Sequence, residues 1–232
     1  KTHSSNAVSQ WSDKSGNNNH ATQATTAKKP TFTADGLNGK PSITFDGSND
    51  SLAVTSLNIS QSYAFFIAAK RVSGSSTKQY LFDGITNNSN RSLVALNKDG
   101  KIQMWASSWA NSNFNTPSDS FIISAVFNSS SSSLSFNGTR VGALNTGAYS
   151  LSNGIRIGGN YVDSADYLKG SIAEFFVLDE TSDANTITKA EGYLAHKWGL
   201  AGNLPSSHPY KQSITKQPKI SISSIGTNSV TV

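Results

Sequence analysis

Glycoside hydrolysis typically uses a pair of acidic side chains at a suitable spacing, and this sequence offers few acids. A retaining glycosidase needs two carboxyl groups about 5 Å apart, which alternate positions on one strand can supply. The chain has three glutamates, Glu174, Glu180 and Glu191. Neither Glu-x-Asp-x-Glu nor Glu-x-Asp-x-x-Glu occurs. The glutamates therefore predict no acid pair of the required kind.

The other titratable groups are no better placed. Asp163 and Asp166 lie in a loop rich in Gly and Asn, and a strand would point Asp179 and the adjacent Glu180 to opposite faces. No cysteine is present, which excludes a thiol nucleophile and a thiolate metal site. No acid or nucleophile lies at a motif spacing from the histidines, which are His3, His20, His196 and His208. We therefore expect that the protein is not an enzyme.

Two tryptophans are candidates for contact with a sugar. One parity of an expected strand carries Gln103, Trp105, Ser107 and Trp109, and the other carries Ile102, Met104 and Ala106. The second set is apolar and suits a core, so both indoles are expected to face outward, about 13 Å apart if the strand runs straight. Flat aromatic faces suit the apolar face of a pyranose. The alternative is that a loop or a helix covers one indole.

Short apolar runs separated by Gly, Asn, Ser and Asp position these residues. This pattern predicts an all-β, two-sheet antiparallel sandwich. The nearly continuous runs at 63–69 and 172–178 are typical of central strands. Turn residues at 97–100 and serines at 129–133 predict hairpins. Strands are expected at 42–45, 63–69, 93–96, 102–105, 121–127, 134–136, 155–157 and 172–178.

One late segment breaks the period of two. Apolar residues three and four apart predict a helix at 184–200, with Ser182 or Asp183 as its cap and Gly199 at its end. The segment and its continuation carry a further aromatic group, whose helical period favours a structural clasp over a ligand site. This group consists of Glu191, Tyr193, Trp198 and Tyr210.

Composition narrows the class of partner. The 232 residues are 36% hydrophobic and 14% charged, which fits one β domain rich in Ser, Thr and Asn. The net charge of +5 is scattered, whereas nucleic-acid-binding proteins typically show a clustered basic stripe. No apolar run approaches the roughly 18 residues that a membrane span needs. We expect neither nucleic-acid binding nor membrane insertion.

Four stretches carry a family likeness. They read VSQWSDKSGNNNHATQ from position 8, NGKPSITFDGSNDSL from 38, GSIAEFFVL from 170 and EGYLAHKWGLAGNLPSSHPYK from 191. Over residues 6–211 the chain resembles the laminin G-like, concanavalin A-like jelly-roll modules of large bacterial secreted and surface proteins. The resemblance implies two antiparallel sheets packed face to face, a late helix against the sandwich, and an extracellular or cell-surface location.

The resemblance also implies a metal. Such modules often hold Ca²⁺, which takes about six to eight oxygen ligands. The acids that the resemblance points to are Asp13, Asp50 and Glu174. The alternative is that Asp13 and Asp46 form turns by accepting hydrogen bonds from backbone N–H groups two residues on.

The two ends of the chain depart from the family pattern. Only the polar residues 1–7 precede the first matching stretch, so the first strand of the module is expected to be missing. The tail matches no part of the module and alternates Ile220, Ile222, Val230 and Val232. We expect a jelly-roll domain at 1–212 and a linker or truncated start of a following β domain at 213–232.

Three functional hypotheses follow. The first is a non-catalytic extracellular binding or adhesion module that binds a polysaccharide or glycoconjugate through Trp105 and Trp109, within a larger surface protein. The second is a structural subunit that self-assembles by β-strand exchange, with the tail of one copy completing the sheet of another. The third is a polysaccharide-degrading enzyme of the same fold, which the missing acid pair disfavours.

Overall fold

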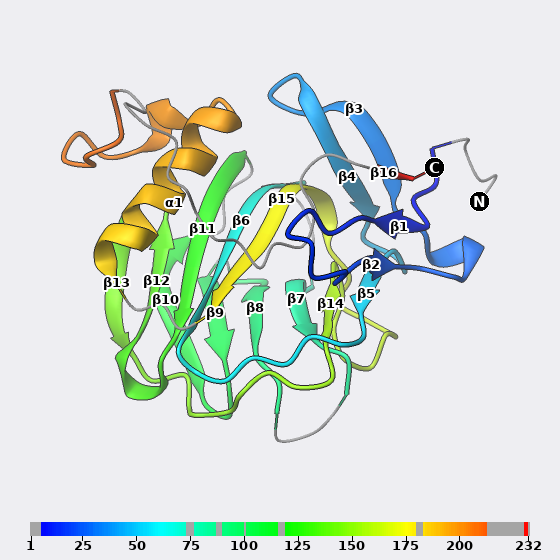
Figure 1. Ribbon diagram of the computed structural model, residues 1–232, viewed down its shortest axis with the longest axis horizontal. Coiled ribbons are helices and arrows are strands. Elements are labelled where there is room, and N and C mark those ends of the chain that lie inside the picture. Colours follow the sequence, from blue (N-terminus) through cyan, green and yellow to red (C-terminus); the bar gives the residue numbers. More distant parts are fainter. Residues whose placement is uncertain are drawn as a thin grey trace.

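The computed structural model shows a β-sandwich of two antiparallel sheets with one α-helix in its described part (Figure 1). The described residues are 6–72, 77–86, 90–99, 101–115, 119–179 and 183–212, together with the backbone of Val230 and Thr231. The predicted fold class, an antiparallel two-sheet sandwich with a late helix, is confirmed. All strands expected from the apolar runs are present; several others were not predicted.

One sheet has nine strands. Their order is β10 (Trp109–Asn115), β9 (Lys101–Trp105), β8 (Leu93–Leu96), β7 (Gln79–Gly84), β14 (Ile155–Ile157), β5 (Leu52–Val54), β2 (Ala21–Thr22), β1 (Gln10–Trp11) and β16 (Val230–Thr231). The facing sheet has seven strands. Their order is β13 (Thr139–Leu144), β12 (Ser132–Phe136), β11 (Ser120–Phe127), β6 (Tyr63–Arg71), β15 (Lys169–Asp179), β4 (Lys40–Asp46) and β3 (Thr31–Leu37).

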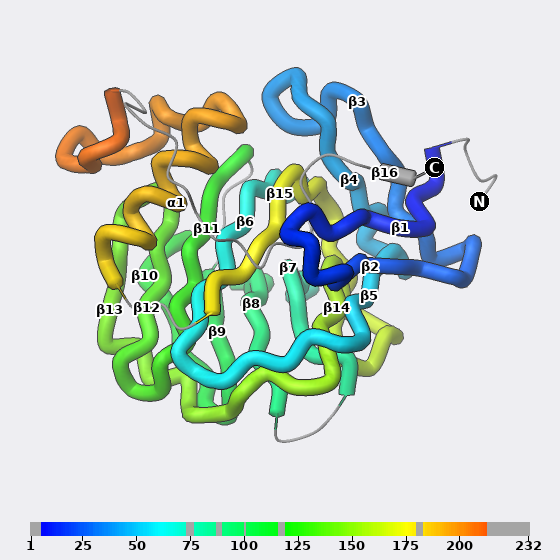
Figure 2. Tube along the Cα trace, in the orientation of Figure 1, coloured from blue at the N-terminus to red at the C-terminus, as the bar shows by residue number. Residues whose placement is uncertain are grey.

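Strands β6 and β15 lie side by side at the centre of the seven-stranded sheet, although they are far apart in the sequence (Figure 2). Residues 63–69 of β6 are all buried. Phe65 and Ile67 face the inside of the sandwich, while Phe66 and Ala68 belong to a second apolar cluster under the helix. The prediction of a central strand buried on both faces is therefore confirmed.

Three phenylalanine rings join the two sheets. Phe65 of β6 and Phe175 of β15 meet Phe82 of β7, which comes from the facing sheet. The ring centroids are 4.2 Å apart for Phe65 and Phe82, and 5.5 Å apart for each of the other two pairs. Aromatic pairs at such distances add about 0.5–1.5 kcal/mol each to the effect of burial alone. These three rings pack the nine-stranded sheet against the seven-stranded sheet.

The helix α1 (Ala184–Lys197) covers the outer face of the seven-stranded sheet and contacts β6 and β11 (Figure 1). Asp183 caps it by accepting a hydrogen bond from the backbone N–H of Thr186 at 2.7 Å. Gly199, at a φ of +70°, follows its end. Both signals were predicted from the sequence. Short 3-10 turns lie at Thr26–Lys28 (η1), Ser129–Ser131 (η2) and Ala201–Asn203 (η3).

A buried carboxylate binds the helix to the sheet. Glu174 of β15 is fully buried. It accepts hydrogen bonds from Trp198 Nε1 at 2.6 Å, Tyr193 Oη at 2.8 Å and Lys197 Nζ at 3.1 Å. A buried charge is tolerated only when it is paired and hydrogen-bonded in this way. Two members of the aromatic group expected to form a structural clasp, Tyr193 and Trp198, therefore hold the helix to the sheet through Glu174.

The tail contributes a strand at one sheet edge. Val230 and Thr231 form β16, which pairs antiparallel with Trp11 and Gln10 of β1. Residues 213–229 and Val232, which complete the predicted tail, lie outside the described residues, as do residues 1–5. Within the part of the chain that the structure describes, no helix is long and apolar enough to cross a membrane.

We predict that Glu174→Gln lowers the free energy of unfolding by on the order of 3 kcal/mol, because the change leaves buried donors facing an amide. Urea unfolding followed by circular dichroism measures this. Asp35→Asn is the control, since Asp35 is an exposed acid on β3 of the same sheet, and it should change stability by less than about 0.5 kcal/mol. Equal curves for Glu174→Gln and the wild type would show that the carboxylate does not hold the helix.

Candidate functional site

The outward face of the nine-stranded sheet carries the candidate site, because the described helix covers the other sheet. Ile102 and Met104 of β9 are buried inside the sandwich. Successive side chains of a strand point to opposite faces, so Gln103 and Trp105 lie on the outward face. The predicted division of this strand into a core face and an outward face is confirmed.

The two tryptophans lie beside each other on neighbouring strands. The chain turns at 106–108, with Ser107 at a φ of +94°, so β9 ends at Trp105 and β10 begins at Trp109. The two residues are directly opposite in register, and their ring centroids are 6.4 Å apart at an interplanar angle of 51°. The expected separation of about 13 Å is wrong, because it assumed a straight strand through Ser107.

The two indoles differ in how far they are built into the protein. Trp109 is 45% exposed. Trp105 packs against a small apolar cluster on the outward face that consists of Tyr80, Leu93 and Ala95. Trp105 therefore supports the structure of this face, whereas Trp109 leaves much of its surface to the solvent.

Two cationic side chains stack on the indoles. The guanidinium carbon of Arg91 lies 4.5 Å from the ring centroid of Trp105 and 4.1 Å from that of Tyr161. The ammonium nitrogen of Lys78 lies 4.1 Å from the ring centroid of Trp109. Such contacts contribute about 0.5–2 kcal/mol each, depending on desolvation. They hold the aromatic rings in place.

An ion pair fixes the position of Arg91. The Oδ2 atom of Asp83, a fully buried residue of β7, lies 2.6 Å from Arg91 Nη1. The backbone N–H groups of Gly84 and Tyr161 donate to the same carboxylate at 2.8 and 3.1 Å. Burial raises the pKa of Asp83 to about 6, although Arg91 and the two N–H groups favour the charged form.

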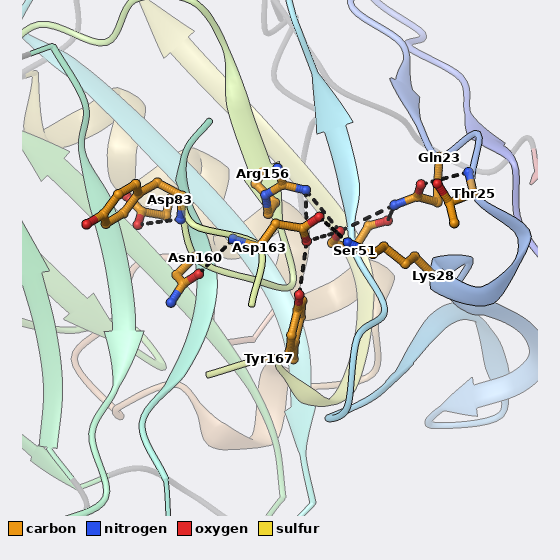
Figure 3. A network of polar contacts seen from close by, with 10 residues as sticks. Gln23, Thr25, Lys28, Ser51, Asp83, Arg156, Asn160, Asp163 and Tyr167 are labelled. Carbon is orange, nitrogen blue, oxygen red and sulfur yellow. Dashed lines mark hydrogen bonds and ion pairs between the residues drawn. The ribbon is translucent and has the colours of Figure 1, made fainter. Parts of the chain in front are cut away.

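A second polar network lies across the same sheet around Asp163, in the connection between β14 and β15 (Figure 3). Its carboxylate lies 2.6 Å from Lys28 Nζ and 3.1 Å from both Arg156 Nη1 and Tyr167 Oη. Burial by itself would raise the pKa of Asp163, but Lys28, Arg156 and Tyr167 hold it below its ordinary value. With so many donors around one carboxylate, we assign this network a structural role.

Two of the other acids considered for catalysis, Glu174 and Glu191, are also engaged in structural contacts. Glu191 Oε2 lies 3.3 Å from Nε2 of His208, and both side chains are buried. Glu174 is bound by the helix, as described above. Glu180 lies outside the described residues. The expectation that the protein has no enzymatic activity stays a prediction.

The structure does not bring the three expected Ca²⁺ ligands together. Asp13 accepts the backbone N–H of Ser15 at 2.8 Å, which is the turn considered as the alternative. Asp50 accepts the backbone N–H of Asp46 at 3.0 Å, and Glu174 faces α1. Across the described ranges, no three His, Asp or Glu side chains gather to hold a metal ion. The three residues do not fit a shared site, because turns and the helix already use their oxygens. Ca²⁺ binding stays a prediction without this ligand set.

The sequence analysis missed the two cations of the site and the tyrosine that stacks with one of them. Lys78, Arg91 and Tyr161 come from three separate connections, and no motif spacing links them. Their contacts depend on the pairing of β7 with β8 and β14, which places distant residues on one face. The available signal was Asp83, a single acid that directly follows the apolar run of β7.

Comparison with known proteins identifies solved structures that share this fold. The sequence matches no family model and no curated protein. Among solved structures, the chain is similar to domain 4 of AbnA, a GH43 extracellular arabinanase from Geobacillus stearothermophilus that was solved with arabinotriose. The TM-score is 0.56 at 14% identity, and the match covers 78% of this chain and 86% of that domain. A heptameric SAP-like pentraxin from Limulus polyphemus has a TM-score of 0.51 at 13% identity, over 65% and 81%.

The chain shares its fold, a two-sheet antiparallel β-sandwich, with these two proteins. A Trypanosoma rangeli sialidase also shares the fold, with a TM-score of 0.55 at 8% identity over 84% of this chain, but the match spans only 32% of the sialidase. At these identities the likeness shows the fold alone. The fold implied by the four matching stretches of sequence is thereby confirmed.

We predict that Asp83 makes the stability of the protein depend on pH. Its pKa in the folded protein, about 6, lies above the ordinary value of 3.8, so the folded state binds the proton more tightly than the unfolded chain. The stability that this group contributes is complete below about pH 4 and is lost as the pH rises through 6. Urea unfolding between pH 4 and pH 7 should therefore show the wild type losing stability relative to Asp83→Asn. The opposite trend would show that the ion pair with Arg91 outweighs burial.

Proposed function

We propose that this protein is a non-catalytic, extracellular carbohydrate-binding and adhesion module, and that it binds a glycan on the outward face of the nine-stranded sheet. The observation that carries the proposal is the indole of Trp109, which is 45% exposed beside a second indole. The flat face of an indole suits the apolar face of a sugar ring.

The groups around Trp109 suit the hydroxyls of a sugar. Asn111 is exposed next to the tryptophan pair in the strand register, opposite the buried Gln103. Lys78 and Arg91 add charged donors on the same face. A few polar groups placed around an aromatic surface are typical of sites that bind small polar ligands.

Two further considerations support a binding role over a catalytic one. Domain 4 of the arabinanase, which shares this fold, was solved in complex with a sugar, arabinotriose. The described acids Glu174, Glu191 and Asp163 are all held by structural partners. The extracellular location rests on the resemblance to secreted modules.

Trp109→Ala should abolish most of the affinity for a bound polysaccharide and leave the melting temperature almost unchanged. Stacking on one aromatic side chain is worth on the order of 1 kcal/mol or more, which corresponds to at least a fivefold loss of affinity. Affinity electrophoresis in gels that contain soluble polysaccharides measures the binding, and thermal unfolding measures the fold.

Two variants serve as controls for Trp109→Ala. Val72→Ala removes a comparably exposed apolar side chain that directly follows β6 in the facing sheet and lies outside the site, and it should bind as the wild type does. Trp105→Ala should lose both affinity and stability, because Trp105 also packs on the apolar cluster around Leu93. Unchanged binding by Trp109→Ala would refute the proposed site.

The pairing of β16 with β1 favours self-assembly by strand exchange as a second candidate function. Val230 and Thr231 extend the sheet through main-chain pairing with β1. Edge pairing of this kind depends little on side chains, so the same edge could be extended by the tail of another copy. A head-to-tail contact would then build an open chain of molecules.

Removal of residues 213–232 tests this second candidate. Strand exchange predicts oligomers of the full chain whose mass rises with concentration in light scattering, and monomers of the shortened chain. Monomers in both cases would exclude strand exchange. Oligomers that persist without the tail would place the contact elsewhere.

A further inference from the structure

On the basis of the proposed function, we infer that the ligand is a single uncharged glycan chain in solution, bound through one or two sugars, and that the side-chain amide of Asn111 donates to its hydroxyls. Three observations carry this inference: the tilt of the aromatic rings, the amide pair beside them, and the balance of charge around them.

The aromatic rings are not arranged for a flat surface. The indoles of Trp105 and Trp109 are inclined to each other by 51°, and the ring of Tyr149 meets Trp105 at 80°. Rings that bind the planar surface of a crystalline polysaccharide must be close to parallel and level with one another. At a centroid distance of 6.4 Å and this tilt, the two indoles cannot lie flat on one plane.

Trp109 offers one stacking position. Lys78 lies over one side of its ring, with Nζ 4.1 Å from the centroid. The ring of Trp105 already stacks with Arg91. A sugar stacked on Trp109 must therefore use the side of the ring away from Lys78, beside a Trp105 ring that Arg91 already contacts.

The amide of Asn111 is held ready as a hydrogen-bond donor. Asn111 and Gln103 are opposite in register, one outward row away from the tryptophan pair, or about 7 Å along the strands. Gln103 Nε2 donates to Asn111 Oδ1 at 2.6 Å, and in this orientation the Asn111 amide turns its Nδ2 away from Gln103. Asn111 Nδ2 makes no hydrogen bond to any other residue in the described ranges. Since Asn111 is exposed, this N–H can donate to a hydroxyl of a sugar stacked on Trp109.

Acidic side chains partly neutralise the two cations at the site. Arg91 forms its ion pair with Asp83 at 2.6 Å. Lys78 lies in the field of Asp166 and Asp99, which oppose the lowering of its pKa by burial. A uronate or sulfated sugar would approach these carboxylates as well as the cations, whereas an uncharged sugar meets no such repulsion.

The test compares three groups of probes. The soluble uncharged polysaccharides are arabinan, galactan, xylan and mixed-linkage β-glucan; the charged ones are polygalacturonate and alginate; the crystalline ones are microcrystalline cellulose and chitin. Affinity electrophoresis measures the soluble polymers, and sedimentation with the solid measures the crystalline ones. The wild type should bind at least one soluble uncharged polymer and should not sediment with either solid.

Variants of β10 test the amide. Asn111→Asp keeps the oxygen that Gln103 bonds and removes the N–H donor, and it should bind at least about fivefold more weakly, as should Asn111→Ala. Asn113→Ala is the matched control, since it removes an exposed amide two residues along the same strand, and it should bind as the wild type does. Thermal unfolding checks that all three variants fold.

Each unexpected result would contradict a different part of the inference. Sedimentation with cellulose or chitin that soluble chains do not compete away would overturn the single-chain inference. Preference for polygalacturonate that disappears at high salt would show a charged ligand. Equal affinity of Asn111→Asp and the wild type would show that the Asn111 amide does not donate to the ligand. Trp109→Ala would still test the proposed function independently. A wild type that binds no probe would contradict the proposed function itself.

Discussion

The alternation of side chains along β9 and β10 is the constraint on which the outward face depends. Burial of Ile102 and Met104 inside the sandwich contributes roughly 2 kcal/mol per side chain to the stability of the fold. It also fixes the orientation of the strand. Gln103 and Trp105 must then point outward. A slip of one residue would exchange the two sets, so the core that determines the fold also determines the composition of the site.

The two sheets differ in what covers them. The seven-stranded sheet is covered by α1, and the buried carboxylate of Glu174 ties it to Trp198 at the end of the helix. On the nine-stranded sheet, Arg91 lies between two aromatic rings and binds a buried acid. This arrangement holds the rings in fixed orientations, and a site that is ordered in advance loses less entropy when it binds.

Local patterns in the sequence were enough to predict much of the fold. The continuous apolar run at 63–69 identified the central strand, and Asp183 and Gly199 marked the ends of the helix. The alternation around Trp105 identified the outward face. In each case the residues that determine the structure are close together in the sequence. The polar strand β10 lacks a clear apolar pattern, and it was not predicted.

The errors arose at a turn that has no local signal and where distant residues decide the outcome. The turn at Ser107 contains no glycine, so the expected strand ran on through it and the distance between the indoles came out too large. Glu174 was predicted to be a metal ligand because the local sequence does not show its hydrogen-bond partners. These partners, Tyr193 and Trp198, belong to the later helical segment. The contacts of Arg91 likewise depend on the order of strands in the sheet, which no local spacing encodes.

The indole N–H signals of the four tryptophans test the central claim most directly. Trp11 and Trp198 are buried, whereas Trp105 and Trp109 lie on the outward face. In a nuclear magnetic resonance titration with a bound soluble polysaccharide, the signals of Trp109 and Trp105 should shift, with those of Trp11 and Trp198 unchanged. Binding that leaves the Trp109 signal unchanged would contradict the account.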